Sequence, residues 1–350
     1  MELEIKELAV TLGSTQLERI GQGHCGTVWA VRCPDCNGHH HMAMKREDGA
    51  PGRSITLEYQ MHQKILKAFL SSRSTSFAIP RSFGYLASQD SATWSGILPR
   101  LPENYTGCNA IVSEKIIPVS TSIRRLLVQN LRPDVKVEDV INSQSNEHCL
   151  IRLYLGRRRY RRSEAQPATG ETRQRLRAFS LRNFPLHLDQ MEQLGIDAGD
   201  YAMAMADALA FLHWVAKVDG NDVEFVLAQP RSQSDTTSTQ GQLDERRFDN
   251  TKILGPHALW ILDFDLCRDL TLDEKGIEQA TKAFWRNDPF YPRPGSSNTE
   301  NQRLWKIFEE RFMLSSAEAL GSEPDQIKQL PKLLIERIKE AKATMAIGST

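Results

Sequence analysis

The arrangement that most constrains this chain is a glycine-rich turn near its start, followed by a lysine at the end of an apolar strand. Gly21, Gly23 and Gly26 stand in IGQGHCGTVW with the spacing G-x-G-x-x-G, and Lys45 ends the segment MAMK. The apolar runs around the turn predict β-strands over residues 15–47. Such a turn lets backbone N–H groups approach a phosphate, but a hairpin that needs left-handed glycines gives the same pattern.

The rest of the chain predicts a second, larger unit that is richer in helix. A buried strand is expected at 108–118 (CNAIVSEKIIP), and helical spacing dominates beyond about residue 120. We therefore expect an α+β fold with two lobes, a small β-rich lobe over 1–120 and a larger helical lobe over 121–350. The segments with amphipathic helical spacing are 55–70, 197–217, 302–313 and 325–345.

Two segments place carboxylates at the ends of apolar strands. Asp263 and Asp265 follow the apolar run ALWIL, and VDGNDVEFVL carries Asp219, Asp222 and Glu224 just before another apolar run. If the segments meet, these groups cannot all remain ionised without a cation. The cation is Mg²⁺ with ATP or the guanidinium of a substrate. The alternative reading is that Asp222 and Asp265 only cap turns.

In chain order, these features resemble the motifs of protein kinases. Lys45 resembles the kinase strand lysine, Glu58 lies on the next helix where its carboxylate partner is expected, and Asp263-Phe264-Asp265 stands in the place of the metal-binding D-F-G. Asp219 precedes an apolar strand with the spacing of the kinase catalytic loop. The resemblance implies a protein-kinase-like two-lobed fold.

The sequence also departs from the kinase pattern at several positions. Lys217-Val218 replaces the His-Arg before the catalytic aspartate, and Glu224 replaces the metal-binding asparagine. Asp265 replaces the glycine of D-F-G, and no A-P-E is present. These changes remove residues that protein kinases use for activation-loop phosphorylation and for docking of the substrate peptide. An ordinary protein kinase is therefore not expected.

A dense arginine segment at 152–182 indicates a nucleic-acid partner. The chain carries 44 Lys and Arg against 44 Asp and Glu, so a polyanion must be met by a local patch such as this one. Guanidinium groups with interleaved tyrosines suit RNA, and a solvated basic loop without a partner is the alternative. The arginines expected to bind RNA are Arg157, Arg158, Arg159, Arg161 and Arg162.

Cys33 and Cys36, with histidines at 39–41, have spacing similar to a zinc knuckle. Their place between two strands favours the tip of a hairpin instead, since no second ligand pair is apparent, and no metal site is expected. A polar segment at about 229–255 cannot bury much apolar area, and it predicts a disordered insertion. The sequence shows neither a signal peptide nor a membrane span, which predicts a cytoplasmic protein without a membrane partner.

Several longer phrases resemble a fungal family labelled as a domain of unknown function or as zinc-finger proteins. They include IGQGHCGTVW, CLIRLYLGRRR, MADALAFLHW, LWILDFDLC and NDPFYPRP, and the resemblance runs from about residue 15 to 312. The family includes arginine-containing cyclodipeptide synthases, which resemble kinases in fold but use aminoacyl-tRNAs. The resemblance implies a synthase that joins arginine from Arg-tRNA to a second aminoacyl group, without ATP, another cofactor or DNA.

The reaction that the resemblance implies assigns a role to each of the charged side chains described above. Asp219 or Glu224 would be the general base, and Lys45 would stabilise developing negative charge. The remaining acidic side chains would bind the substrate, in particular its guanidinium group; they are Glu58, Asp222, Asp263 and Asp265. Two other functions remain open: an ATP-dependent small-molecule phosphotransferase of the aminoglycoside-kinase type, and a catalytically inactive pseudokinase that serves as an interaction module.

Overall fold

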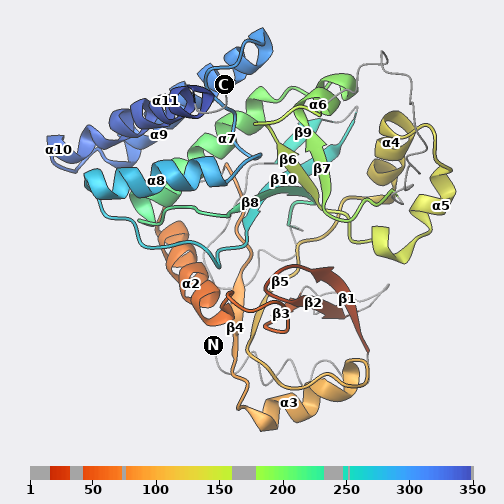
Figure 1. The fold of residues 1–350 in the computed structure, drawn as a ribbon. Helices are drawn as coiled ribbons and strands as arrows, with labels where there is room; N and C mark the ends of the chain where they lie inside the picture. Colours follow the sequence, from red (N-terminus) through yellow and green to blue (C-terminus); the bar gives the residue numbers. More distant parts are fainter. Residues whose placement is uncertain are drawn as a thin grey trace.

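The computed structural model describes residues 16–31, 42–72, 76–159, 179–231, 247–250 and 253–347. These residues form a mixed α+β structure with two five-stranded sheets. In Figure 1 the first sheet lies in a small lobe below a larger lobe, which holds the second sheet and most of the helices. The expected α+β class is confirmed at this level.

The small lobe is built on an antiparallel sheet with the strand order β1-β2-β3-β5-β4. Its core contains Trp29 from β2, Met44 from β3 and Val112 from β5, together with Trp94 from a covering helix. The expected strands of residues 15–47 and 108–118 are confirmed. The elements of this lobe are β1 (Leu17–Gln22), β2 (Thr27–Val31), β3 (Met42–Arg46), α2 (Ile55–Ser71), β4 (Ser82–Leu86), α3 (Ser91–Ile97) and β5 (Ala110–Glu114).

Helix α2 joins the small lobe to the larger one. Ser54 caps its N-terminus by accepting a hydrogen bond from the backbone N–H of Leu57 at 3.3 Å. The apolar face of α2 belongs to the large core, where the rings of Phe69 and Phe211 lie 5.7 Å apart in an edge-to-face contact. Because the same helix carries Glu58 toward the small sheet, its burial in the larger lobe fixes that carboxylate between the lobes.

The second sheet has the strand order β7-β6-β8-β10-β9. The pair of β8 and β10 was expected from its apolar runs, whereas the parallel pair β6 and β7 was not. Each of these two strands has only four residues, too few to reveal a period of two. The strands are β6 (Ile151–Tyr154), β7 (Phe184–His187), β8 (Glu224–Ala228), β9 (Phe248–Asn250) and β10 (Gly255–Leu262).

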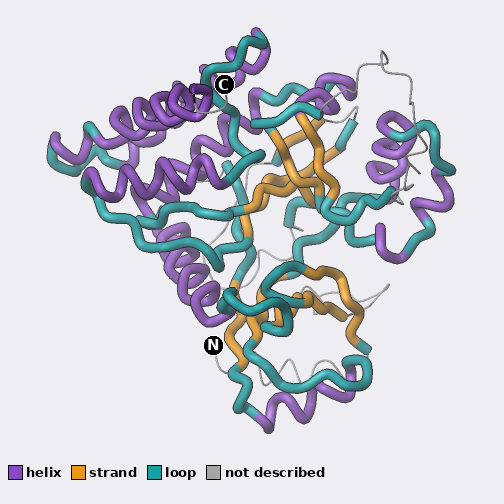
Figure 2. Tube along the Cα trace, viewed as in Figure 1, coloured by secondary structure: helices purple, strands orange, loops and turns teal. Residues whose placement is uncertain are grey.

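The helices of the larger lobe share one apolar cluster with one face of this sheet, whereas the other face, with Val226 and Trp260, packs against Ala78. In Figures 1 and 2, α7, α8, α9 and α11 gather to the left of the sheet, and α4 and α5 lie to its right. Phe308 and Phe312 of α9 are fully buried and lie within one large apolar cluster. The helices of the larger lobe are α4 (Thr121–Leu131), α5 (Val137–Ile141), α6 (Leu188–Leu194), α7 (Gly199–Ala210), α8 (Glu274–Arg286), α9 (Thr299–Ala319), α10 (Asp325–Lys328) and α11 (Leu330–Ile347).

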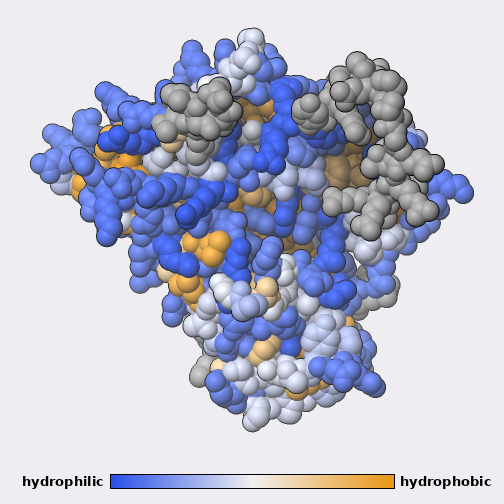
Figure 3. Space-filling view, in the orientation of Figure 1, coloured by the Kyte–Doolittle hydropathy of each residue, from blue (hydrophilic) through white to orange (hydrophobic). Residues whose placement is uncertain are grey.

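The expected long helices are confirmed with small changes. Helix α7 continues into a π-helical turn, Phe211–Val215, and stops at Lys217, whose φ of 54° is left-handed. Across the described ranges, no helix combines the length and the apolar character that a membrane crossing requires. Polar residues cover most of the face shown in Figure 3.

The ends of the segment predicted to be disordered, 229–255, are ordered. Arg231 forms an ion pair with Glu114 at 2.7 Å, and β9 pairs with the start of β10. The predicted bounds were therefore too wide, because ion pairing and strand pairing stabilise a polar segment at its ends without a large apolar surface. Residues 232–246 and 251–252 lie outside the described residues.

Candidate functional site

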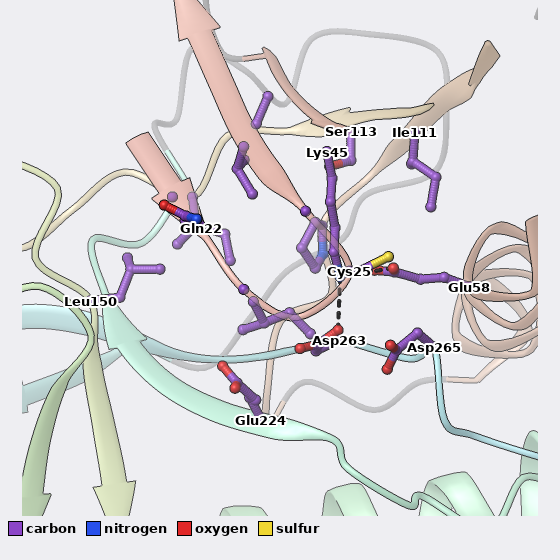
Figure 4. A pocket seen from close by; sticks show the side chains of 18 of the residues that line it. Gln22, Cys25, Lys45, Glu58, Ile111, Ser113, Leu150, Glu224, Asp263 and Asp265 are labelled. Atoms are coloured by element: carbon purple, nitrogen blue, oxygen red, sulfur yellow. Dashed lines mark hydrogen bonds and ion pairs between the residues drawn. The ribbon is translucent and has the colours of Figure 1, made fainter. Parts of the chain in front are cut away.

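A cavity of about 960 Å³ lies between the two lobes. Its walls come from the glycine-rich turn, β3, α2, the segment after β5, and the ends of β6, β8 and β10. Figure 4 shows Lys45 reaching down from the small lobe toward Asp263, with Glu224 below and Glu58 to one side. The structure thus brings together segments more than 200 residues apart in the chain, since Lys45 and Asp263 are separated by 218 positions.

One part of the cavity is apolar. Ile20, Val28 and Ala43 line it from the small sheet, and Leu150 and Val226 line it from the larger lobe. Two facing apolar walls suit a flat ring or an aliphatic side chain, because both remove apolar surface from water. The charged groups lie at the other part of the cavity, so its ligand is expected to have an apolar and a polar end.

Lys45 is the centre of the charged part. Its Nζ lies 2.8 Å from Glu58 Oε1 and 2.8 Å from Asp263 Oδ1. Burial by itself would lower the pKa of Lys45, but the two carboxylates together raise it well above its ordinary value. The ammonium therefore stays charged at any physiological pH. This geometry agrees with the pairing of Lys45 and Glu58 expected from the sequence.

A second cation, Arg53, was not foreseen as part of the site. One guanidinium nitrogen of Arg53 lies 3.0 Å from Asp222 Oδ2 and 2.8 and 2.7 Å from the two oxygens of Asp265. The side chain of Asp265 is only 2% exposed, whereas that of Asp222 is 45% exposed. The acidic cluster was expected to need a positive guest, but the chain itself supplies one guanidinium to this pair of carboxylates.

The sequence around Arg53 gives only a weak indication that this residue belongs to the site. Arg53 directly precedes Ser54, the N-cap of α2, in the segment PGRS. Its partners lie 169 and 212 positions further along the chain, and no local pattern records such a contact. The one feature of the sequence that could have suggested this contact is a positively charged side chain in a chain whose predicted cleft is acidic.

Glu224 pairs with a third cation that lines the cavity. Its Oε1 lies 2.7 Å from a guanidinium nitrogen of Arg152, and both side chains line the cavity. Burial raises the pKa of Glu224 to about 7, although Arg152 acts in the opposite direction. A carboxylate with this pKa is present in both protonation states near neutral pH, as a general acid or base requires.

Asp219 does not share this cavity. Its Oδ1 accepts hydrogen bonds from the backbone N–H of Asn221 at 3.1 Å and of Arg268 at 3.0 Å, and its Oδ2 accepts one from Gln279 at 2.9 Å. Asp219 is 5% exposed and is absent from the residues that line the cavity. The prediction of Asp219 as a base in the cleft therefore does not fit the geometry, in which Asp219 links its own loop to Arg268 and to Gln279 of α8.

The glycine-rich turn is fastened to the loop between β3 and α2. The N–H groups of Gly49 and Ala50 donate to the carbonyl oxygens of Cys25 and His24 at 3.1 and 2.9 Å. Gly26 has a φ of 150°, and a Cβ there would lie 2.1 Å from the carbonyl oxygen of Arg46. The turn therefore needs glycine at Gly26 for close packing, which is a structural reason independent of any phosphate.

Three neighbouring arginines of the 152–182 segment, at 157–159, lie against acids. Arg157 pairs with Asp288, Arg158 lies 2.6 Å from Glu192, and Arg159 lies 2.9 Å from Asp189. These pairs leave little net positive charge at the three positions. Arg161 and Arg162 lie outside the described residues.

No group of three or more metal-ligating side chains occurs within the described ranges. Cys33, Cys36 and the histidines at 39–41 lie outside them. Cys25, Cys108, Cys149 and Cys267 are free thiols. The carboxylates of the cavity are arranged around Lys45, Arg53 and Arg152, not around a common vacant centre.

One protein family matches part of the chain. The family model DUF3669, described as a zinc finger protein, matches residues 259–324, which run from β10 through α9. This segment holds a single cysteine and no histidine, so it lacks the four ligands of a structural zinc site. The match does contain Asp263 and Asp265 of the cavity. Neither the curated proteins nor the solved structures include a match to this chain.

Proposed function

We propose that this chain is a cyclodipeptide synthase with a protein-kinase-like fold, which joins arginine from Arg-tRNA to a second aminoacyl group. The product is a cyclo(Arg-Xaa) diketopiperazine, and no ATP or other cofactor is consumed. The proposal rests on the sequence resemblance and on the chemistry of the cavity. The fold supports it through a five-stranded antiparallel sheet, a helix that pairs Glu58 with Lys45, and Asp263 at a strand end between two lobes.

The observation that carries the proposal is the internal pairing of the carboxylates. In a kinase-like site, the positions of Glu224 and Asp263 hold magnesium ions that carry the nucleotide. Here Asp263 contacts Lys45, Glu224 contacts Arg152, and Asp265 is held by Arg53. A magnesium nucleotide would have to displace several charge-assisted hydrogen bonds, which favours a reaction without one.

The reaction needs only proton transfer and charge stabilisation. An aminoacyl-tRNA is an activated ester, so the amine of one aminoacyl group attacks the ester carbonyl of the other. A C–N bond forms, a C–O bond breaks, and the proton of the amine goes to the departing ribose oxygen. A second attack of the same kind closes the ring and releases the second tRNA.

The structure offers a group for each step. Glu224, with its pKa of about 7, accepts the proton from the attacking amine and returns it to the ribose oxygen. The ammonium of Lys45 lies in the same cavity and stabilises the negative charge of the tetrahedral intermediate. Asp222 contacts Arg53 through one oxygen and is partly exposed, so its other oxygen remains for the guanidinium of the substrate.

The test is expression of the chain in a heterologous host, followed by untargeted mass spectrometry of extracts. We expect diketopiperazines that contain arginine with the wild-type chain and a loss of at least about a hundredfold with Glu224→Gln, the usual size of a general-base effect. Arg303→Gln on the exposed surface is the matched control, and it should leave the product unchanged. ATP turnover without any diketopiperazine would replace this proposal by the phosphotransferase, and absence of both would favour the interaction module.

A further inference from the structure

Two carboxylates of the cavity depend on one loop, residues 219–223, which directly precedes β8. Asp222 belongs to this loop, and Glu224 is the first residue of β8. Gly220 and Asp222 both have a φ of 66°, in the left-handed region that residues other than glycine rarely adopt. The positions of the two carboxylates therefore depend on what holds the loop in this conformation.

The side chain of Asn287 makes three hydrogen bonds to the backbone of this loop. Asn287 is the C-cap residue of α8 and lies 65 positions after Asp222 in the chain. Its Oδ1 accepts a hydrogen bond from the backbone N–H of Asp222 at 2.5 Å. Its Nδ2 donates to the carbonyl oxygens of Gly220 at 3.0 Å and of Val223 at 3.2 Å. One amide group thus binds the loop at both ends of the turn 220–223.

These three partners require an amide at position 287. An amide has an acceptor oxygen and a nitrogen with two hydrogens, which match one N–H group and two carbonyl groups. A carboxylate of the same shape would turn an acceptor toward the two carbonyl oxygens, and an alanine would leave all three groups without this partner. Asn287 is only 3% exposed, so bulk water does not readily replace its hydrogen bonds.

Asn287 acts on the cavity through the loop. It is not among the residues that line the cavity, whereas its partner Asp222 is. The carboxylate of Asp222 in turn lies 3.0 Å from a guanidinium nitrogen of Arg53. The contacts therefore run from α8 through Asp222 to the segment between β3 and α2 in the small lobe.

The loop has a second anchor, which holds its first residues. The backbone N–H of Asp219 donates to the carbonyl oxygen of Arg268 at 3.0 Å. The Nδ2 of Asn221 donates to the carbonyl oxygen of Leu266 at 3.3 Å. These bonds fix the start of the loop, and the end of the loop, which leads into β8, is held by Asn287.

We propose that Asn287 is a positioning residue of the candidate site, which fixes the loop so that Asp222 faces Arg53 and Glu224 enters the cavity at the start of β8. The three hydrogen bonds of Asn287 and its place outside the cavity wall support this role. The inference deepens the proposed function, on which it rests for the reaction that the carboxylates serve. The contacts themselves do not depend on that reaction.

The first test is hydrogen–deuterium exchange of the purified full chain, which needs no activity. The variant Asn287→Ala removes three buried hydrogen bonds from the loop. The backbone amides of residues 219–224 should therefore exchange at least about tenfold faster than in the wild type.

A second reading comes from the segment between β3 and α2, because a purely local role of Asn287 would leave this segment unchanged. The backbone N–H groups of Gly49 and Ala50 donate to the glycine-rich turn and protect the segment from exchange. If Asn287→Ala releases Asp222 from Arg53, their exchange should rise by at least about threefold. Asp222→Ala should cause the same rise, and the double variant should not exceed it by more than about twofold.

Asn146→Ala is the matched control, since Asn146 is also 3% exposed and does not line the cavity. Its side chain likewise makes three hydrogen bonds; the partners are Val140, Ser180 and Leu181. Both variants should lose a similar amount in melting temperature, but Asn146→Ala should leave exchange at 49–50 and 219–224 within about twofold of the wild type. Diketopiperazine formation should fall at least about tenfold in Asn287→Ala and stay within about twofold in Asn146→Ala.

The two kinds of measurement separate this inference from the proposed function. Unchanged exchange at 219–224 in Asn287→Ala, or faster exchange there without a rise at 49–50, would overturn the inference, because the amide would then serve only its own loop. Formation of product by Asn287→Ala at the wild-type rate would overturn it as well. If the wild-type chain makes no diketopiperazine, the proposed function fails, and the rise at 49–50 would still support Asn287 as the residue that positions Asp222.

Discussion

Replacement of Arg53 tests how the acidic cluster is held together. The substitution Arg53→Met keeps the length of the side chain but removes the guanidinium from Asp265, whose side chain is 2% exposed. Removing one member of a fully buried ion pair costs about 3–5 kcal/mol. Since the side chain of Arg53 is 22% exposed and that of Asp222 is 45% exposed, water screens part of this interaction. We expect a loss of about 2–3 kcal/mol at pH 7.

The loss should depend on pH in a defined direction. Burial already raises the pKa of Asp265, and removal of the neighbouring guanidinium raises it further. An acid whose pKa is higher in the folded state destabilises that state at pH values above its unfolded pKa of about 3.9. This destabilisation diminishes as the pH falls, by up to about 1.4 kcal/mol per pH unit. The difference between Arg53→Met and the wild type should therefore be smaller at pH 5 than at pH 7.

The assay is thermal and urea unfolding of a double-mutant cycle with Arg53→Met, Asp265→Asn and the double variant. At about 2 °C per kcal/mol for a chain of this size, Arg53→Met should melt about 5 °C lower at pH 7. Arg303→Met, at an exposed pair with Glu300, is the control and should change stability by less than about 0.5 kcal/mol. A coupling between Arg53 and Asp265 below about 0.5 kcal/mol, or a loss that grows toward pH 5, would refute the reasoning.

Three other predictions follow from single features. Because Glu224 must be ionised to accept a proton, diketopiperazine formation should rise with pH through about 7 and level off above it; a rate that is flat between pH 6 and 8 would remove Glu224 as the base. Gly26→Ala should lower the melting temperature because its Cβ would meet the carbonyl oxygen of Arg46 at 2.1 Å, whereas Gly23→Ala has no atom within 4 Å and should be nearly neutral; equal effects would contradict the packing of the turn. Phe308→Ala removes a fully buried ring and should cost about 3–5 kcal/mol in urea unfolding; a cost below about 1 kcal/mol would show that α9 is packed differently.

The sequence predicts those parts of the site that depend on local pattern. The apolar run before Asp263 and the helical spacing around Glu58 each indicate the element that carries the carboxylate. Chain order then suggests that both carboxylates face Lys45, and the structure shows contacts of 2.8 Å to each. The carboxylates could be placed because their elements have strong hydrophobic periodicity.

Ion pairs between residues far apart in the chain could not be predicted from the sequence. Nothing near Arg53 indicates Asp265, and nothing in the arginine-rich segment indicates that Arg158 and Arg159 face Glu192 and Asp189. Such pairs form only after packing brings distant loops together, so a residue count cannot distinguish a basic patch from a neutralised one. Asp219 is a similar case, because its hydrogen bonds to Arg268 and Gln279 depend on the final position of α8 and of the segment before it.

The most direct test of the central claim is reconstitution from purified parts. Arg-tRNA that carries isotopically labelled arginine is mixed with a second aminoacyl-tRNA and the purified chain, after apyrase has removed all ATP. The account predicts a labelled diketopiperazine, together with deacylated tRNA in a ratio of two per product, and its loss in Glu224→Gln. Failure of the wild-type chain to form any labelled diketopiperazine from both aminoacyl-tRNAs, or a product that appears only when ATP is restored, would contradict it.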